Sequence, residues 1–312
     1  MIQTPGPAAE ISKQGFTIIK KFISNHQKDS ALQAHIQNAN KFSDGVIKDI
    51  PEELMTEIRE GIKKIIPSIA TELNLSTSAN DFAYCAIRIE KSSPETILRK
   101  PFNLHQDPKI SAGGVLNWHL DHYSFYLYKD HINWLICYIP IFKPDPSLAN
   151  LAIIPQNLVK ELDPDLYQKI TGRGAMRFRC AETDTLEWFT QRFPDLEVNI
   201  GDWFAIDDFD DASPGFKIKF DLEAYKSVPE LEPYDLLIMR ADVIHRTHDA
   251  GSDRISVRCD AMPLNALNLS SWTGLFRMTL QYPFMGAKRK YNIRRWLMNE
   301  WQMRLAKFKR SA

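Results

Sequence analysis

A series of short apolar stretches, separated by Pro, Gly, Asp and Asn, runs through the middle of the chain. The stretches cover residues 82–89, 134–142, 151–154, 202–206, 236–239 and 255–259. Runs of this length are typical of β-strands, and the residues between them favour turns. The pattern therefore predicts a β-rich body and excludes an all-helical fold.

Three further patterns flank this body. Phe16 and Ile18 alternate after Gly15, which predicts a short strand entering a helical region. Between residues 51 and 73 apolar residues recur three and four apart, which predicts a helix with one core face that Pro67 should break or kink. That face consists of Leu54, Ile58, Ile62, Ile65 and Ile69. Residues 288–310 show the same spacing and predict an amphipathic helix.

The charges are balanced overall, with 39 Lys and Arg against 39 Asp and Glu, but two segments depart from this balance. Residues 182–232 hold 14 acidic and 4 basic side chains, a net charge of −10, whereas residues 288–310 have a net charge of +8. A chain without net charge has no general attraction to polynucleotides, which argues against nucleic acid as a partner. We expect the acidic segment to be a solvated insertion and the basic helix to pack one face on the body.

The remaining composition excludes several other classes. No apolar run approaches the ~20 residues of a membrane-spanning helix, and residues 1–12 have neither a basic start nor an apolar core. We therefore expect a cytoplasmic protein that is not a membrane protein. The four cysteines are far apart, which predicts neither a zinc knuckle nor a disulfide scaffold.

These patterns predict one domain over residues 1–312. Its expected parts are a helical support at about 25–75, a β core at about 82–262 that contains the acidic insertion 182–232, and the basic helix at about 288–310. Nothing in the sequence decides the oligomeric state.

Two short neighbourhoods hold five of the eight histidines, and they contain a possible metal site. His119 and Asp121 are two residues apart, so on a strand both side chains would share one face. His245 follows the apolar stretch 236–239 and supplies a third ligand. Two imidazoles and one carboxylate form the facial triad of mononuclear non-haem Fe(II) oxygenases, which leaves coordination positions open.

A candidate carboxylate site follows the third histidine. Arg254 and Ser256 lie nine and eleven residues after His245 and face the same side of a predicted strand. An enclosed guanidinium suits bidentate binding of a carboxylate, and a serine hydroxyl can add a donor.

With these residues the sequence resembles the Fe(II)/2-oxoglutarate-dependent dioxygenase superfamily and, within it, the phytanoyl-CoA dioxygenase-like family. The similar segments are Trp118 to Asp121, Tyr138 to Ile141, Asn150 to Pro155, and the HR…DRIS stretch at 245–256. The chain departs from the family pattern at Gln156 and Asn157, where Gly and Ser-His are usual.

The resemblance implies a double-stranded β-helix, a cupin-like jelly roll that is mainly β with flanking helices. It implies that His119, Asp121 and His245 bind Fe(II), that Arg254 and Ser256 bind 2-oxoglutarate as cosubstrate, and that Tyr138 lines that site. Dioxygen would be the second cosubstrate. Related halogenases have Ala or Gly in place of the carboxylate, so Asp121 argues for hydroxylation, while desaturation, epoxidation and cyclisation remain open.

Alternative assignments exist for each part of the site. His105 and Asp107 form a second His-x-Asp pair, and His248 with Arg258 is an alternative to His245 with Arg254. We favour His119 and Asp121 over His105 and Asp107 because they lie nearer the 134–141 strand. We favour His245 over His248 because it directly follows an apolar strand. We expect His26, His35, His122 and His131 to be structural or solvent-facing.

The main functional hypothesis is a hydroxylase acting on a small molecule of natural-product or amino-acid type, with release of succinate and carbon dioxide. The alternatives are a catalytically inactive jelly-roll module that binds or regulates, and an oxygenase acting on a protein or nucleic acid. The acidic segment suggests a lid that favours a cationic substrate.

Overall fold

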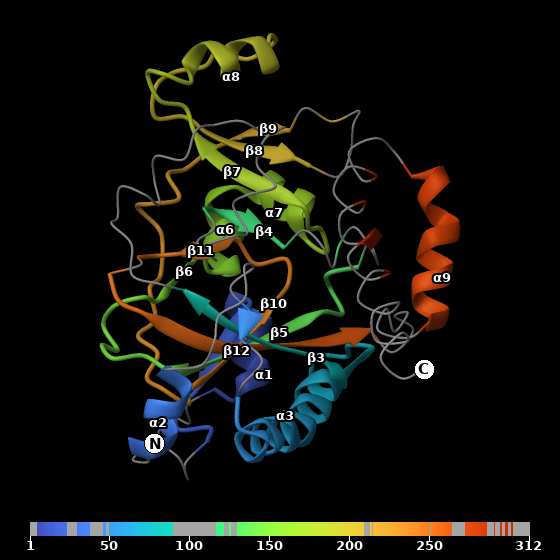
Figure 1. Ribbon diagram of the computed structural model, residues 1–312. Coiled ribbons are helices and arrows are strands. Elements are labelled where there is room, and N and C mark those ends of the chain that lie inside the picture. Colours follow the sequence, from blue (N-terminus) through green and yellow to red (C-terminus); the bar gives the residue numbers. More distant parts are fainter. Residues whose placement is uncertain are drawn as a thin grey trace.

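The computed structural model describes residues 5–23, 30–37, 46–47, 50–89, 117–121, 125, 130–208, 213, 215–249, 251–263, 272–285, 290, 294, 297–298 and 301. Within them the strands form two antiparallel sheets, which lie one above the other in Figure 1.

The first sheet has the order β1-β10-β5-β12-β3-β2. Its strands are β1 (Phe16–Ile19), β10 (Leu236–Arg240), β5 (Leu135–Phe142), β12 (Arg254–Pro263), β3 (Thr77–Ile89) and β2 (Val46–Ile47). The second sheet has the order β6-β11-β4-β7-β8-β9. Its strands are β6 (Leu151–Ile153), β11 (His245–Thr247), β4 (His119–Leu120), β7 (Met176–Cys180), β8 (Trp203–Asp207) and β9 (Phe216–Ile218).

The strands alternate between the two sheets along the chain. β3, β5, β10 and β12 belong to the first sheet, while β4, β6 and β11, which lie between them in sequence, belong to the second. This winding is that of a double-stranded β-helix, in which two sheets enclose one interior. The prediction of a mainly β jelly roll with flanking helices is confirmed.

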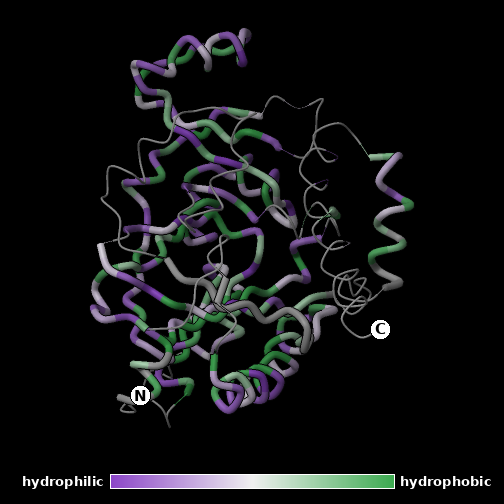
Figure 2. The backbone as a smooth tube through the Cα atoms, in the orientation of Figure 1, coloured by the Kyte–Doolittle hydropathy of each residue, from purple (hydrophilic) through white to green (hydrophobic). Residues whose placement is uncertain are grey.

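Helices cover the outer faces of the sheets. The helix α3 (Glu52–Glu72) lies below the first sheet in Figure 1, and its apolar side chains pack against alternate residues of β5 and β12, including Ile139 and Val257. The short helices α6 (Gln156–Leu162) and α7 (Pro164–Ile170) supply Val159, Leu166 and Ile170 to the core on the outer face of the second sheet. Figure 2 shows hydrophilic and hydrophobic residues mixed along α3, as expected of a helix with one buried face.

The helix α3 continues through Pro67 and is not broken there. A proline inside a helix costs about 3 kcal/mol because it removes one backbone hydrogen bond. The buried side chains of Ile58, Ile62 and Ile66 contribute about 1.5–3 kcal/mol each by leaving water, which outweighs that cost. Ile66 is fully buried, whereas Ile65, assigned to the core face from spacing alone, is only partly buried.

The acidic segment 182–232 contributes to the second sheet. β8 is buried along its whole length and pairs with β7, while β9 forms the edge of the sheet. The helix α8 (Leu186–Arg192) projects beyond the sheet at the top of Figure 1. Thus only part of the segment lies outside the β body.

Part of the negative charge in this segment is neutralised by basic side chains outside it. Asp207 pairs with Arg173 and Asp208 with Arg177, each at 2.6 Å, and both arginines lie outside the segment. A carboxylate held by an arginine or lysine attracts a second cation weakly. The count of −10 therefore overstates the field that a lid would offer to a cationic substrate.

The ends of the chain add further helices. α1 (Pro7–Gln14) precedes β1, so the helix comes before the predicted strand, and α2 (Ser30–Gln37) follows it. α9 (Trp272–Gln281) and the 3-10 helix η2 (Tyr282–Phe284) follow β12. Most of the basic segment 288–310 lies outside the described residues, although those described at 290, 294, 297–298 and 301 are helical. Among the described helices, none has the length and hydropathy needed to cross a membrane.

Candidate metal centre

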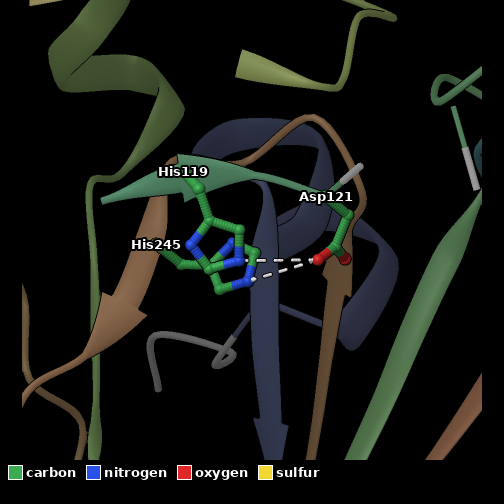
Figure 3. A group of neighbouring side chains, drawn as sticks. All are labelled: His119, Asp121 and His245. Carbon is green, nitrogen blue, oxygen red and sulfur yellow. Dashed lines mark ion pairs between the residues drawn. The ribbon is translucent and has the colours of Figure 1, made fainter. Parts of the chain in front are cut away.

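His119, Asp121 and His245 lie together inside the barrel, and each is less than a tenth exposed. His119 and His245 are directly opposite each other on the neighbouring strands β4 and β11, and their ring centroids are 4.3 Å apart. Asp121 Oδ1 lies 3.6 Å from His119 Nε2 and 3.9 Å from His245 Nε2, as Figure 3 shows. One ligand atom from each residue lies within 4.8 Å of the other two, so the three can share one ion.

Backbone carbonyls determine which imidazole nitrogen is available. His119 Nδ1 lies 2.7 Å from the carbonyl oxygen of Asn117, and His245 Nδ1 lies 2.9 Å from that of Val243. A carbonyl only accepts, so each Nδ1 carries the proton and each Nε2 presents its lone pair toward Asp121. Burial and the nearby His119 lower the pKa of His245 to about 4, which keeps the ring neutral at neutral pH. Both features suit metal ligation.

The carboxylate is held in its ionised form. Burial alone would raise the pKa of Asp121, but the positive charge of Arg258 holds it well below its usual range. Arg258 Nη2 donates to Asp121 Oδ2 at 3.0 Å, which leaves Oδ1 facing the histidines. The backbone beneath is tightly packed, since a Cβ on Gly174 would lie 2.6 Å from the carbonyl oxygen of Asp121.

A glutamate joins the two histidine-bearing strands on their outer face. Trp118 Nε1 donates to Glu223 Oε1 at 2.7 Å, and Arg246 Nη2 donates to Glu223 Oε2 at 2.8 Å. The Arg246 guanidinium also lies 5.0 Å from the Trp118 ring centroid. Although burial would raise the pKa of Glu223, hydrogen bonds from Arg246, Lys226 and Trp118 lower it to about 2. Since Trp118 and Arg246 are next to the two histidines in sequence, Glu223 fixes the spacing of their strands.

A second polar group holds the turn that leads into His245. Asp242 is fully buried and accepts hydrogen bonds from Gln156 Nε2 at 2.9 Å and the Gly172 backbone at 2.7 Å. Arg240 Nε donates to the same carboxylate at 3.0 Å. Gln156, which departs from the family pattern, therefore has a structural role in this chain.

The predicted carboxylate site is also assembled. Arg254 is 2% exposed, donates from Nη1 to the carbonyl oxygen of Ala149, and lies 5.5 Å from the centroid of the Tyr138 ring. The Tyr138 hydroxyl lies 2.5 Å from Ser256 Oγ. Arg254 Nε is buried and has no hydrogen-bond partner among the residues that the structure describes. A buried guanidinium nitrogen without an acceptor fits the binding of a ligand carboxylate.

A buried lysine adds positive charge beside this site. Lys143 Nζ donates to the carbonyl oxygens of Pro146 and Leu231 and to Asn150 Oδ1, all of which are uncharged acceptors. Burial, together with the positive charge of Arg254, lowers the pKa of Lys143 to about 8. Two neighbouring buried cations without a hydrogen-bonded carboxylate favour an anionic ligand.

The donor set fits a divalent transition metal with open coordination positions. Two neutral imidazoles and one carboxylate suit Fe(II), whereas a structural zinc site closes with four protein ligands, most often including thiolates. Among the described residues, His119, Asp121 and His245 are the one group of three or more His, Cys, Asp or Glu that meets the spacing for a metal ion.

The structure describes only part of the alternative residues for the site and of the other histidines. His105, Asp107, His26 and His122 lie outside the described residues, as does the side chain of His35. His248 lies at the end of β11, half-buried, and Arg258 contacts Asp121. His131 is fully buried, as expected for a structural histidine, with Nδ1 3.1 Å from the Arg173 carbonyl oxygen, and burial lowers its pKa to about 4.

Sequence reasoning missed Glu223 and Lys143, and it considered Arg258 only as an alternative to Arg254 and not as the partner of Asp121. A signal existed for Arg258, because residues 254–260 alternate polar and apolar and so place Arg258 on the same strand face as Arg254 and Ser256. For Glu223 and Lys143 no local pattern is present, since their partners come from segments distant in sequence.

No family model and no curated protein sequence matches the chain. Solved structures resemble it at 10–13% identity. The non-haem α-ketoglutarate-dependent epimerase SnoN from nogalamycin biosynthesis has 12% identity and a TM-score of 0.42, covering 82% of this chain and 81% of its own. EctD from S. alaskensis, with bound Fe, has 10% identity and a TM-score of 0.43 over 83% and 76%. EvdO2 from Micromonospora carbonacea var. aurantiaca, complexed with 2-oxoglutarate, has 13% identity and a TM-score of 0.42 over 84% and 93%. Because the TM-scores of these three structures are below 0.5, the function is inferred below from the residues of this chain.

Proposed function

We propose that the protein is an Fe(II)- and 2-oxoglutarate-dependent oxygenase that acts on a small molecule. The observation that carries the proposal is the convergence of Asp121 Oδ1 with the Nε2 atoms of His119 and His245 in a buried site. The two imidazoles and the carboxylate would hold the iron and leave its other positions to the cosubstrates.

The second part of the proposal is that β12 and β5 bind 2-oxoglutarate. Arg254 would receive its distal carboxylate on the guanidinium edge whose Nε has no described partner. The Ser256 and Tyr138 hydroxyls lie beside it, and Lys143 adds a second buried positive charge. A dicarboxylate that spans this cluster and the triad satisfies the unpaired donor and balances the charge.

When bound, iron, 2-oxoglutarate and dioxygen supply oxidative decarboxylation to succinate and carbon dioxide and the oxidising power that acts on a substrate C–H bond. The residues of the chain orient and enclose this chemistry. The Asn117 and Val243 carbonyls hold the imidazoles in their ligating tautomer, and the enclosed barrel limits access of water.

The finer assignments belong to the same proposal. We assign hydroxylation as the reaction, a natural product or amino acid as the substrate class, and the phytanoyl-CoA dioxygenase-like group as the family. The supports are the intact Asp121 and the motif similarities at 118–121, 138–141 and 245–256. Cytoplasmic location and the absence of a nucleic-acid partner stay predictions.

The direct test is turnover without added substrate. Purified protein with Fe(II), 2-oxoglutarate and dioxygen should release succinate slowly, and the release should depend on each component. An Asp121→Asn variant should release none, while Asp202→Asn, which loses a carboxylate remote from the triad, should behave as wild type. Equal succinate release by wild type and Asp121→Asn would overturn the proposal.

A further inference from the structure

An arginine on β12 reaches across the barrel to the carboxylate of the candidate metal centre. Arg258 lies on β12 of the first sheet and Asp121 directly follows β4 of the second, and Arg258 Nη2 donates to Asp121 Oδ2 at 3.0 Å. Its Nε donates to Asp260 Oδ1 at 2.9 Å. The guanidinium therefore lies between two carboxylates, one of which belongs to the triad.

The same strand face carries the cosubstrate residues. Side chains two apart on a strand share a face, so Arg254, Ser256, Arg258 and Asp260 all point into the barrel. The residues between them, Ile255, Val257 and Cys259, pack in the core on the other side. One strand thus presents both the candidate 2-oxoglutarate residues and the partner of the metal carboxylate.

The contact divides the two oxygens of Asp121 between different partners. Oδ2 accepts from Arg258, whereas Oδ1 faces the Nε2 atoms of both histidines. The position of the carboxylate needs such help, because β4 is only two residues long and ends at Leu120, before Asp121. Without a partner on Oδ2, the side chain is free to turn about χ1 and χ2.

We propose that Arg258 is a positioning residue for the metal, which presents Oδ1 of Asp121 as the ligand and holds its orientation from the opposite sheet. The inference rests on the proposed function, since it assumes that the triad binds a divalent metal. Asp260 fixes Arg258 in turn and offsets its charge, so that the arginine orients the carboxylate without repelling the metal.

The test is titration of the full-length apo-protein with Co(II), followed by visible absorption and calorimetry without cosubstrate. Loss of a group that orients a metal ligand typically weakens metal binding about 10- to 100-fold, and we expect this range for Arg258→Gln. The Co(II) spectrum of the saturated variant should also differ from wild type, because Asp121 is no longer oriented. Arg258→Lys, which keeps the charge but has a shorter reach, should give an intermediate affinity.

Two further variants separate positioning from folding. Arg258→Gln/Asp260→Asn keeps the net charge of the cluster and does not leave the Asp260 carboxylate without its arginine, and it should show the same weakening and spectral change. Arg173→Gln removes a comparable arginine from the 2.6 Å pair with Asp207, so it should lower thermal stability but leave Co(II) affinity and spectrum unchanged.

Wild-type affinity and spectrum in both Arg258→Gln and the double variant would overturn the positioning role and leave the proposed function intact. Failure of the wild-type protein itself to bind Co(II) would overturn the proposed function together with the inference. The two failures are therefore distinguishable.

Discussion

The two halves of the site are held in place by different means. His119 and His245 belong to β4 and β11 of the second sheet, which are two and three residues long, and Asp121 directly follows β4. Arg254, Ser256 and Tyr138 belong to β12 and β5, which are ten and eight residues long. The long strands orient their side chains through an extended backbone ladder, whose register shifts once, between Ile255 and Ser256. The short strands depend on polar side chains around them, namely Glu223, Asp242 and Arg258.

This difference predicts which substitutions should weaken metal binding and which should weaken ligand binding. Substitutions on the outer polar networks should disturb the metal half and spare the carboxylate half. Substitutions on β12 that keep the ladder should change ligand binding with little loss of stability. The predictions below, in order of expected effect, test this separation.

Removing the triad carboxylate should have the largest effect. Asp121→Ala loses one of three protein ligands, so we expect Co(II) affinity to fall by at least about 100-fold, more than for loss of an orienting partner. Calorimetric titration of apo-protein measures the change. The matched control is Asp202→Ala, which loses the carboxylate paired with Lys217 away from the triad and should keep wild-type affinity. Equal affinities in the two variants would contradict the assignment.

Removing the Arg254 guanidinium should weaken binding of 2-oxoglutarate and leave the metal half of the site unchanged. Arg254→Gln loses a charge-assisted interaction with the cosubstrate worth about 1.5–3 kcal/mol, which corresponds to about 10- to 150-fold weaker 2-oxoglutarate binding. Binding is measured anaerobically on Co(II)-loaded protein, and Co(II) affinity itself should not change. If both affinities fell together, the two halves would not be independent.

Glu223→Gln should lower stability in a pH-dependent way. The pKa of Glu223 in the folded protein, about 2, is below its ordinary value of 4.5, so its stabilisation is present above pH 4.5 and is lost as the pH falls toward 2. After allowance for solvent screening of this partly exposed group, we expect the variant to lose about 1–2 kcal/mol at pH 7. The loss should shrink near pH 3.

The matched control for Glu223 is Asp165→Asn, which removes an exposed carboxylate 2.7 Å from Lys219. Urea unfolding at several pH values compares the two variants. A loss that stayed constant between pH 7 and pH 3 would show that the Glu223 network does not act through its charge.

The smallest predicted effect concerns the loop that supports Arg254. Ala149 has φ of 53°, in the left-handed region, and its carbonyl accepts from Arg254. Glycine adopts this conformation without steric cost but loses more entropy on folding, so Ala149→Gly should raise the free energy of unfolding by about 0.5–1 kcal/mol. Thermal unfolding checks this, and a lower melting temperature would contradict it. Affinity for 2-oxoglutarate should not change.

The strands and the triad were open to prediction because their signals are local. Alternation and apolar runs predicted the strands of the β body, and the spacing of His119 and Asp121 placed them on one face. Of the two outcomes expected at Pro67, a break or a kink, the break was wrong, because burial of the α3 face depends on packing that spacing does not measure. The segment 182–232 was predicted to be a solvated insertion from its acidic residues alone. The sequence does not show that β8 is buried in the second sheet or that Arg173 and Arg177 pair with two of the carboxylates.

The polar networks were not predictable from local patterns. The Arg258–Asp121 contact joins β12 to the residue that follows β4, 137 positions away, and Glu223 meets Trp118 across 105 positions. Such contacts depend on how the two sheets face each other, which only the folded arrangement decides. The alternation in residues 254–260 indicated that Arg258 points inward, but not toward which partner.

Anaerobic titration of apo-protein with Fe(II) and 2-oxoglutarate tests the central claim most directly. The account predicts a weak visible charge-transfer band that appears only when both components are present and that is lost in Asp121→Ala and weakened in Arg254→Gln. Absence of the band in folded wild-type protein would contradict the assignment of the triad and of Arg254. A band as strong in both variants as in the wild type would contradict it too.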